Sequence, residues 1–299
     1  MLIKGIYHEQ TGRNDLARIH IADLKQNIKI LQVTDSHITE ADERDPEAEA
    51  HAKNRGSGLF YKETPTGESC LNVFKKTMTM GRESGANGCV LTGDIIDFPT
   101  WKNIDELNHV IKGFEAPVHF TPGNHDWSFP DHWDTTAQQK YYPRLDGLTN
   151  NNPSYQSTEL CGVRLISLDN SAYQVSHEQV EFLKQELAKG QPSLLLIHIP
   201  LWIESLAPDV IKQWGAPIMM ATQHGWTNEK RERWKVEGND PSTLECYELL
   251  TQGKSDNLAG IFCGHVHLSH TDSYREGRYQ YVTEQGYTGG YRMIELVKA

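Results

Sequence analysis

The sequence has no long hydrophobic run and no excess of positive charge. No stretch of its 299 residues approaches the roughly eighteen apolar residues that span a bilayer, and the opening MLIKGIYHEQTG lacks the apolar core of a signal peptide. The formal net charge of −11 disfavours partners that are held by a basic field, such as nucleic acid or an anionic membrane. We therefore expect a cytoplasmic protein whose partner is a small molecule.

Cysteine is also scarce. The five cysteines are odd in number, widely spaced and never part of a CxxC pair, which indicates neither a disulfide framework nor a structural zinc site. Apolar residues make up only 37% of the chain, but seven Trp, twelve Tyr and eight Phe supply bulk for a sizeable core. We expect reduced thiols in a cytosolic interior at Cys70, Cys89, Cys161, Cys246 and Cys263.

Several short apolar runs have the length of strands and end in polar or glycine residues. Continuous apolar runs of this kind are typical of strands that are covered on both faces, as in α/β sheets. The segment 278–296 predicts two further strands around a glycine-rich turn. The apolar runs cover residues 28–34, 88–93, 117–121, 163–168, 193–199 and 259–264.

Helical patterns lie between these runs. In the clearest pattern Ser176 and Gln179 are spaced for a capping box. In another, Pro241 can open the first turn, and Ser242 and Glu245 are placed for a cap. The predicted helices cover residues 71–84, 103–114, 176–190 and 241–253.

The length fits either two ordinary domains or one large α/β domain. We favour a single domain over residues 1–299, because the strong motifs recur from residue 35 to residue 267 with no linker between them. Long connections inside a compact domain are usually functional or disordered. Three such insertions are predicted, near residues 40–70, 127–160 and 203–240.

Polar side chains that can bind metal follow five of the predicted strands. The carboxyl ends of strands form the ligand crevice of open α/β sheets, so these residues are expected to converge in space. They are found in Asp35-Ser36-His37, Gly93-Asp94-Ile95-Ile96-Asp97, Gly123-Asn124-His125-Asp126, His198-Ile199-Pro200 and Gly264-His265-Val266-His267.

The residue types indicate the kind of site. Asp, Asn and His without a thiolate suit Mn, Fe or Zn. The candidate ligands number seven, which is too many for one ion, whereas two ions that share a bridging carboxylate would use them all. They are Asp35, His37, Asp94, Asn124, His198, His265 and His267. Two such ions about 3.5–4 Å apart can hold a bridging hydroxide and clamp a phosphoryl group. The sequence therefore predicts two divalent metal ions and a phosphorylated substrate.

The order of the motifs, D-x-H, GD-x-x-D, GNHD, a lone H after a strand and GH-x-H, resembles the calcineurin-like metallophosphoesterase superfamily. The resemblance runs from residue 29 to residue 268. It implies an α/β fold, a four-layer α/β/β/α sandwich of two mixed sheets with helices outside. It also implies ligands for a first metal at Asp35, His37 and His267, ligands for a second at Asn124, His198 and His265, and a bridge at Asp94.

The resemblance also implies roles for residues that do not bind metal. His125 would lie beside the substrate and either protonate the leaving oxygen or stabilise charge on the phosphoryl group, and Asp97 would orient its imidazole and favour its cationic form. Gly123 would let the backbone turn sharply. Asp126 more often has a structural role in this family, and we interpret the segment Asp169-Asn170-Ser171 as a turn.

Aromatic residues flank the motifs. Trp127 and Trp202 adjoin His125 and His198 and are the best candidates to line a substrate pocket, but plugging the core beneath the long loops is an equally good interpretation. The basic run KRERWK (230–235) and His224 are more typical of a solvated face and a loop.

The function predicted from these features is hydrolysis of a phosphate ester, through a metal-bridging hydroxide, on a small nucleotide-like or other phosphorylated metabolite. Phe98-Pro99 and Asp126 depart from the protein Ser/Thr phosphatases, and the motif order matches class III cyclic-nucleotide phosphodiesterases. Phosphodiesterase and phosphomonoesterase both remain open, and a nuclease is disfavoured by the acidic charge. The rival interpretation is a non-catalytic metal-binding scaffold or interaction module on the same fold. The sequence does not indicate an oligomeric state.

Overall fold

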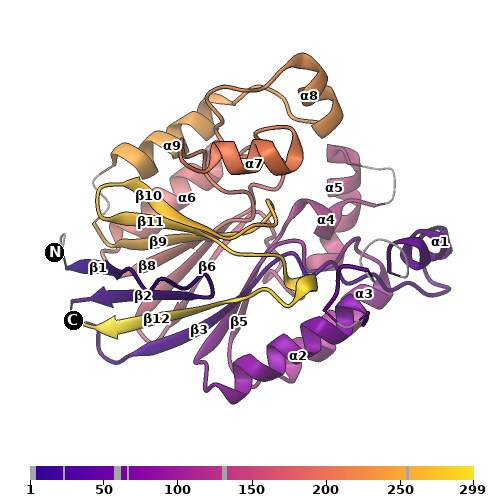
Figure 1. The fold of residues 1–299 in the computed structure, drawn as a ribbon, viewed down its shortest axis with the longest axis horizontal. Helices are drawn as coiled ribbons and strands as arrows, with labels where there is room; N and C mark the ends of the chain where they lie inside the picture. Colours follow the sequence, from indigo (N-terminus) through magenta and orange to yellow (C-terminus); the bar gives the residue numbers. More distant parts are fainter. Residues whose placement is uncertain (1–4, 23, 57–61, 66, 130–132, 254–255) are drawn as a thin grey trace.

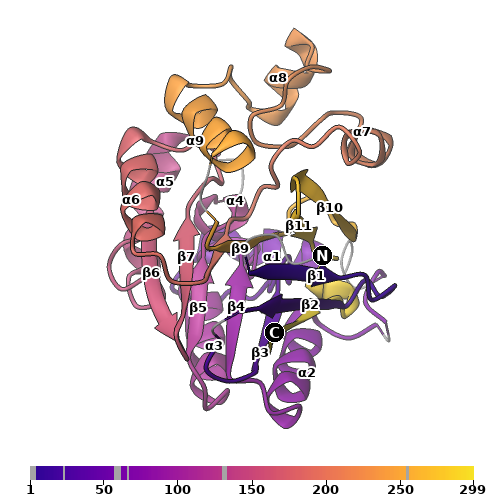
Figure 2. The same cartoon turned by 90° about the vertical axis from the view of Figure 1, so that its left-hand side faces the viewer.

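The computed structural model describes residues 5–22, 24–56, 62–65, 67–129, 133–253 and 256–299. Within these residues two six-stranded sheets lie between helices (Figure 1). Figure 2 shows α9 on one side of the strands and α2 on the other, in a view turned by 90°. The predicted α/β/β/α sandwich of two mixed sheets is confirmed.

The first sheet has the strand order β1-β2-β12-β3-β4-β5. Strands β3, β4 and β5 are parallel neighbours, so their carboxyl ends lie at one edge. Strand β12 is parallel to β2 and antiparallel to β3, which makes the sheet mixed. The strands are β1 (Ile6–Glu9), β2 (Leu16–Ile21), β3 (Ile28–Val33), β4 (Gly88–Thr92), β5 (Val118–Thr121) and β12 (Arg292–Lys298).

The second sheet has the strand order β10-β11-β9-β8-β7-β6. Its four central strands are parallel and its two edge strands pair antiparallel to their neighbours. The two strands expected in 278–296 are present as β11 and β12, but they belong to different sheets. The strands are β6 (Tyr155–Leu160), β7 (Val163–Leu168), β8 (Ser193–Leu196), β9 (Leu258–Cys263), β10 (His270–Arg275) and β11 (Arg278–Val282).

Two pairs of helices cover the outer faces, and all four were predicted. The capping box of Ser176 and Gln179 is confirmed, because each side chain bonds the backbone of the other residue. Pro241 opens the first turn of the last of these helices as predicted, but the cap predicted from Ser242 and Glu245 is wrong, because Asp240 is the N-cap. These helices are α2 (Cys70–Glu83), α3 (Trp101–Lys112), α6 (His177–Ala188) and α9 (Pro241–Gln252).

Buried apolar side chains fill the three spaces between the four layers. One cluster joins the first sheet to α2 and α3 and includes Leu31 and Phe74. A second lies between the sheets and contains Ile30 from one and Leu194 from the other. A third joins the second sheet to its helices and includes Ile261. Burial of apolar surface on both faces explains why the central strands are continuous apolar runs.

The predicted insertions contain short helices. Residues 40–70 hold α1 (Pro46–Asn54), residues 127–160 hold α5 (Thr135–Tyr141) and a 3-10 turn η2 (Tyr142–Leu145), and residues 203–240 hold α7 (Ala207–Trp214) and α8 (Asn228–Trp234). Parts of the first two insertions, 57–61, 66 and 130–132, lie outside the described residues. In the part of the chain that is described, no helix has the length and apolar character needed to cross a membrane.

Candidate metal centre

The five motif-bearing strand ends meet at one place in the fold. Three of them follow β3, β4 and β5 of the first sheet, and two follow β8 and β9 of the second. Since these strands run parallel within each sheet, their carboxyl ends bring residues from positions 35 to 267 together. Three groups of side chains there could each hold a metal ion.

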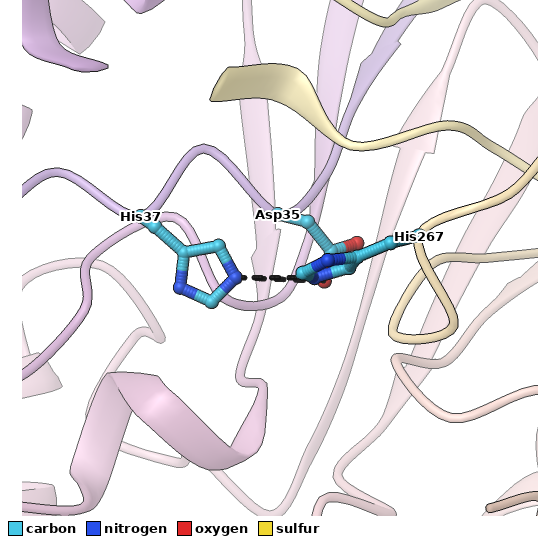
Figure 3. A group of neighbouring side chains, drawn as sticks. All are labelled: Asp35, His37 and His267. Atoms are coloured by element: carbon cyan, nitrogen blue, oxygen red, sulfur yellow. Dashed lines mark hydrogen bonds and ion pairs between the residues drawn. The ribbon is translucent and has the colours of Figure 1, made fainter. Parts of the chain in front are cut away.

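The first group joins Asp35 and His37 to His267. A carboxylate oxygen of Asp35 lies 3.2 Å from Nε2 of His267, and Nε2 of His37 lies 3.3 Å from the same nitrogen. Figure 3 shows the two imidazole rings pointing toward one another, with the carboxylate of Asp35 beside His267. The ligand atoms of the group all lie within 4.8 Å of one another.

The second group joins Asp94 to His198 and His265. The Oδ2 atom of Asp94 lies 3.1 Å from Nε2 of His198, which lies 3.3 Å from Nδ1 of His265. All three side chains are buried. Burial lowers the pKa of His198, but the charges of Asp94 and Asp35 outweigh it and raise the pKa to about 10. A ligating imidazole must be neutral, so a cation here would displace that proton.

Asp94 also belongs to a third group, with His37 and His125. It is therefore near residues of both other groups. Burial raises the pKa of Asp94, but the surrounding histidines, His198 first, hold the pKa well below its usual value. An ionised carboxylate in this position can serve ions on either side.

The buried oxygens of the centre fit a cation. Oδ1 of Asn124 is buried and has no hydrogen-bond partner among the described residues, and Oδ1 of Asp35 is buried without a hydrogen bond there but faces Nε2 of His267 at 3.2 Å. Burying an oxygen acceptor without a partner is costly, and a cation is the partner that such acceptors with nearby imidazoles would take. Asp, Asn and His donors without thiolate suit Mn, Fe or Zn.

The backbone is held in the left-handed region at five of the seven expected ligands. The φ angles are 50° at Asp35, 45° at His37, 53° at Asp94, 68° at His265 and 51° at His267. Such conformations are uncommon for residues with a side chain, and clusters of them occur at functional sites. The surrounding hydrogen bonds hold them: for example, the amide of His37 donates to the carbonyl of Asp94 at 3.0 Å.

Gly123 allows the backbone of its loop to approach Asp94 closely. Its φ of −107° is one that any residue adopts, so the sharp turn expected there is not the reason for glycine. A Cβ at this position would instead lie 2.3 Å from Oδ1 of Asp94. The absence of a side chain lets the loop after β5 pack directly against Asp94.

Residues behind the expected ligands orient them. The hydroxyl of Tyr173 lies 3.0 Å from Nε2 of His265, and the carbonyl of Thr92 lies 2.9 Å from Nδ1 of His198. The side-chain oxygen of Asn170 accepts the amides of His198 and Ile199. Partners of this kind fix the tautomer and orientation of ligating histidines. Sequence reasoning missed these roles, although Asn170 does follow a buried strand, as the expected ligands do.

His125 lies beside Asp97. Its Nδ1 atom lies 2.9 Å from Oδ1 of Asp97, and the same oxygen lies 3.2 Å from Nδ1 of His37. Burial lowers the pKa of His125, but the charges of Asp94 and Asp97 outweigh it and raise the pKa above its usual value. The geometry therefore favours a cationic imidazole at this place.

Asp126 holds the loops together. Its Oδ2 atom accepts the backbone amides of Asp94 at 2.8 Å and Gly123 at 2.7 Å, and Oδ1 accepts the amide of Ile96 at 3.1 Å. The structural role expected for this residue is confirmed. It ties the loop after β4 to the loop after β5.

The structure bears on the two interpretations of the tryptophans. Trp127 is 4% exposed, packs in a cluster with Phe98 and Tyr141, and donates its indole N–H to Ser171 at 2.7 Å. Trp202 packs against the core of the second sheet. Both positions agree with the core alternative. Trp133, which is 41% exposed, is the tryptophan whose ring contacts His125 edge-on, at 4.8 Å between centroids.

Comparison with known proteins identifies the class of fold and site. A model of the family described as calcineurin-like phosphoesterase matches residues 28–269. The chain belongs to this family, a class of metal-dependent phosphoester hydrolases. The match includes all seven expected ligands and His125, and it supports divalent metal ions as cofactors.

The particular relatives agree with this class. A probable cyclic nucleotide phosphodiesterase of Fibrobacter succinogenes is 32% identical over 113 residues, which are 37% of this chain and 41% of that protein. The similarity therefore spans less than half of the relative. A dimetal phosphatase from Danio rerio has a TM-score of 0.54 at 12% identity and covers 90% of this chain and 93% of its own. A purple acid phosphatase from yellow lupin seeds has a TM-score of 0.53 at 14% identity over 92% of this chain and 46% of its own. These structures share the fold.

Proposed function

We propose that this protein hydrolyses a phosphate ester of a small nucleotide-like metabolite at a centre of two divalent metal ions. The observation that carries the proposal is the buried oxygen of Asn124, which no hydrogen-bond donor among the described residues reaches, within a set of aspartates and histidines that follow five strands. Manganese, iron and zinc all suit the donor set.

The residues divide into two ligand sets. When bound, the ions supply Lewis acidity toward the phosphoryl oxygens and an activated nucleophile. Asp94 is the shared ligand in this proposal, because it lies near both sets. The first set is Asp35, His37 and His267, and the second is Asn124, His198 and His265.

His125 acts on the leaving group. Its Nδ1 is directed to Asp97, so Nε2 is the nitrogen that can face a substrate. As the bond from phosphorus to the incoming oxygen forms and the bond to the leaving oxygen breaks, His125 gives the Nε2 proton to the leaving oxygen. Asp97 holds the imidazole in orientation and stabilises its cationic form before the transfer.

A cyclic nucleotide is the leading substrate class. Support comes from the partial similarity to a relative named as a probable cyclic nucleotide phosphodiesterase and from the acidic net charge, which disfavours long nucleic acids. The exposed ring of Trp133 beside His125 offers a surface on which a base can stack. A phosphomonoester is the second candidate, because nothing in the donor set separates monoesters from diesters.

The cysteine pattern supports a cytoplasmic location. Four of the five cysteines are buried free thiols. Free thiols persist in reducing compartments. Fractionation of the native protein would check the location.

The test is a substrate panel. Protein loaded with manganese would be given cyclic nucleotides, nucleotide monophosphates, an aryl phosphate and its diester, with metal content measured in parallel. We expect hydrolysis of at least one nucleotide diester, and a much lower rate in the His125→Ala variant. Bound metal without hydrolysis of any of these esters would contradict the proposal and favour the scaffold.

A further inference from the structure

Arg55, an arginine of the first predicted insertion, lies at the edge of the candidate metal centre. Arg55 caps the end of α1, and its guanidinium contacts Asp97 at two points. Its Nη2 donates to Oδ1 of Asp97 at 2.5 Å, and its Nε donates to Oδ2. None of the five motifs that follow the strands includes Arg55, and the two residues are 42 positions apart.

The start of α1 is anchored to the rest of the fold. Asp45, which precedes the helix, accepts the backbone amide of Trp101 at 2.7 Å and pairs with Nη1 of Arg144 at 2.8 Å. Ala48 and Ala52 are buried in the small cluster that contains Phe98. Because the start of α1 is anchored, the helix holds Arg55 in place beside Asp97.

Asp97 is a shared acceptor. Its Oδ1 atom faces Nδ1 of His37 at 3.2 Å and Nδ1 of His125 at 2.9 Å, in addition to Nη2 of Arg55. A carboxylate that is held at one oxygen can rotate about its last bond. The two-point contact from Arg55 fixes that rotation, so that Oδ1 stays between the two imidazoles. Bidentate arginine–carboxylate pairs are both stronger and more directional than single contacts.

The charge of Arg55 has a second consequence. Asp97 is 3% exposed, and a buried carboxylate needs compensation. A permanent cation on its outer side supplies this compensation without taking a proton from either histidine. Both imidazoles are then free to donate their Nδ1–H to Asp97 and to present Nε2 to the centre.

We infer that Arg55 is a positioning residue for phosphoester hydrolysis, which acts through Asp97 to orient His125 and His37. The inference rests on the proposed function. It gives the first insertion, residues 40–70, a role in the reaction through a contact that crosses from α1 to the loop after β4. Lysine cannot replace Arg55, because an ammonium group does not form two parallel bonds to one carboxylate.

Three variants test the inference. Arg55→Ala removes both contacts with Asp97, and Arg55→Lys keeps the positive charge but loses the two-point contact. Arg44→Ala is the matched control, because Arg44 belongs to the same insertion and pairs with the partly exposed Asp42 and the exposed Asp105. We expect kcat to fall about 10–100-fold in Arg55→Ala, with KM within about twofold, which is the usual span for an outer partner of a metal-ligand histidine.

Two further readouts separate positioning from a structural role. Guanidinium ion, added well below concentrations that unfold the protein, should restore part of kcat in Arg55→Ala and leave Arg44→Ala unchanged. In protein loaded with diamagnetic zinc, the Nδ1–H proton signals of His37 and His125 should shift or broaden in both Arg55 variants and persist in Arg44→Ala.

The outcomes are distinguishable. Equal kcat in Arg55→Ala and Arg44→Ala, with unchanged imidazole signals, would overturn the inference while leaving the hydrolase proposal intact. If Arg55→Ala does not fold, Arg55→Lys tests the inference instead. A wild-type kcat and unchanged imidazole signals in Arg55→Lys would show that the two-point contact has no role in positioning. An inactive wild-type protein would contradict the proposed function itself, and the zinc-loaded spectra would then still decide whether Arg55 orients the two histidines.

Discussion

Oδ1 of Asp97 and Nδ1 of His125 lie 2.9 Å apart, although the two residues follow different strands. Asp97 follows β4 and His125 follows β5, and these strands are parallel neighbours. The distance between the two side chains is therefore set by the sheet and by Asp126, which ties the two loops together. The contact turns one nitrogen of His125 to Asp97, which leaves the other for the proposed proton transfer to a substrate.

The His125→Ala variant should separate chemistry from metal binding. We expect it to retain both ions and to lose roughly 10²–10⁴ in turnover, the usual contribution of a positioned acid. Steady-state kinetics and metal analysis of the same preparation would measure both. His224→Ala is a suitable control, because His224 is exposed and pairs only weakly with Glu204, at 3.4 Å. Normal turnover in His125→Ala would show that the assignment is wrong.

The Asp94→Asn variant should lose metal and activity together. An amide supplies no charge to two divalent ions, and Asp94 is the residue that lies near both ligand sets. Metal content after dialysis and the rate of ester hydrolysis should fall in parallel, whereas Asp42→Asn, in a partly exposed ion pair with Arg44, should change neither. Retention of two tightly held ions in Asp94→Asn would contradict the shared-ligand assignment.

The Asp126→Ala variant should destabilise the fold. Three buried backbone amides, of Asp94, Gly123 and Ile96, would lose their acceptor. Unpaired buried donors cost about 1–3 kcal/mol each, so we expect a loss of roughly 3 kcal/mol or more in the free energy of unfolding, measured with urea. Asp126→Asn keeps one oxygen acceptor and should lose less. If the alanine variant lost less than about 0.5 kcal/mol in the free energy of unfolding, the three amides would not depend on this carboxylate for their stability.

Stability should depend on pH through His119. Burial lowers its pKa from 6.5 to about 4, so the folded chain holds His119 neutral where the unfolded chain binds a proton. The contribution of neutral His119 to the free energy of unfolding is therefore fully present above pH 6.5. It is lost as the pH falls toward about 4, and the total loss is roughly 3 kcal/mol.

The His119→Gln variant isolates this contribution. Its stability should decline less than that of the wild type between pH 6.5 and about 4, because glutamine does not titrate. Urea unfolding at several pH values, with the same excess of manganese for both proteins, would cancel the effect of metal release. Parallel pH profiles would show that His119 is not held neutral.

The parts of the fold that were predicted from sequence are those with two covered faces. The central strands, such as β4 and β9, are buried throughout and so form continuous apolar runs. Three of the four edge strands, β1, β6 and β10, escaped prediction for the opposite reason, whereas the edge strand β5, which is mostly buried, was predicted. The strands β6 and β10, with sequences YQSTEL and HTDSYR, are mostly half-exposed and carry polar residues on both faces. The strand β1 is only four residues long.

The site was predictable to the extent that its residues follow strands in motifs. Arg55 belongs to no motif, and its contact with Asp97 depends on how α1 packs against Phe98. Trp127 and Trp202 were chosen by their neighbours in sequence. Adjacent residues on a tight turn point in different directions, so a neighbour of His125 can lie in the core. Such packing is decided by tertiary contacts that no local pattern contains.

Strand β12 has a consequence for how the protein is made. It lies between β2 and β3, with Ile294 opposite both Ala17 and Ile30. The ribosome therefore synthesises β2 and β3 more than two hundred and fifty residues before the strand that separates them. These two strands are antiparallel and close in sequence, so a nascent chain can pair them as a hairpin, which must open to admit β12. The native order of the first sheet therefore cannot form before β12 has been synthesised, and pairings over such sequence distances form slowly.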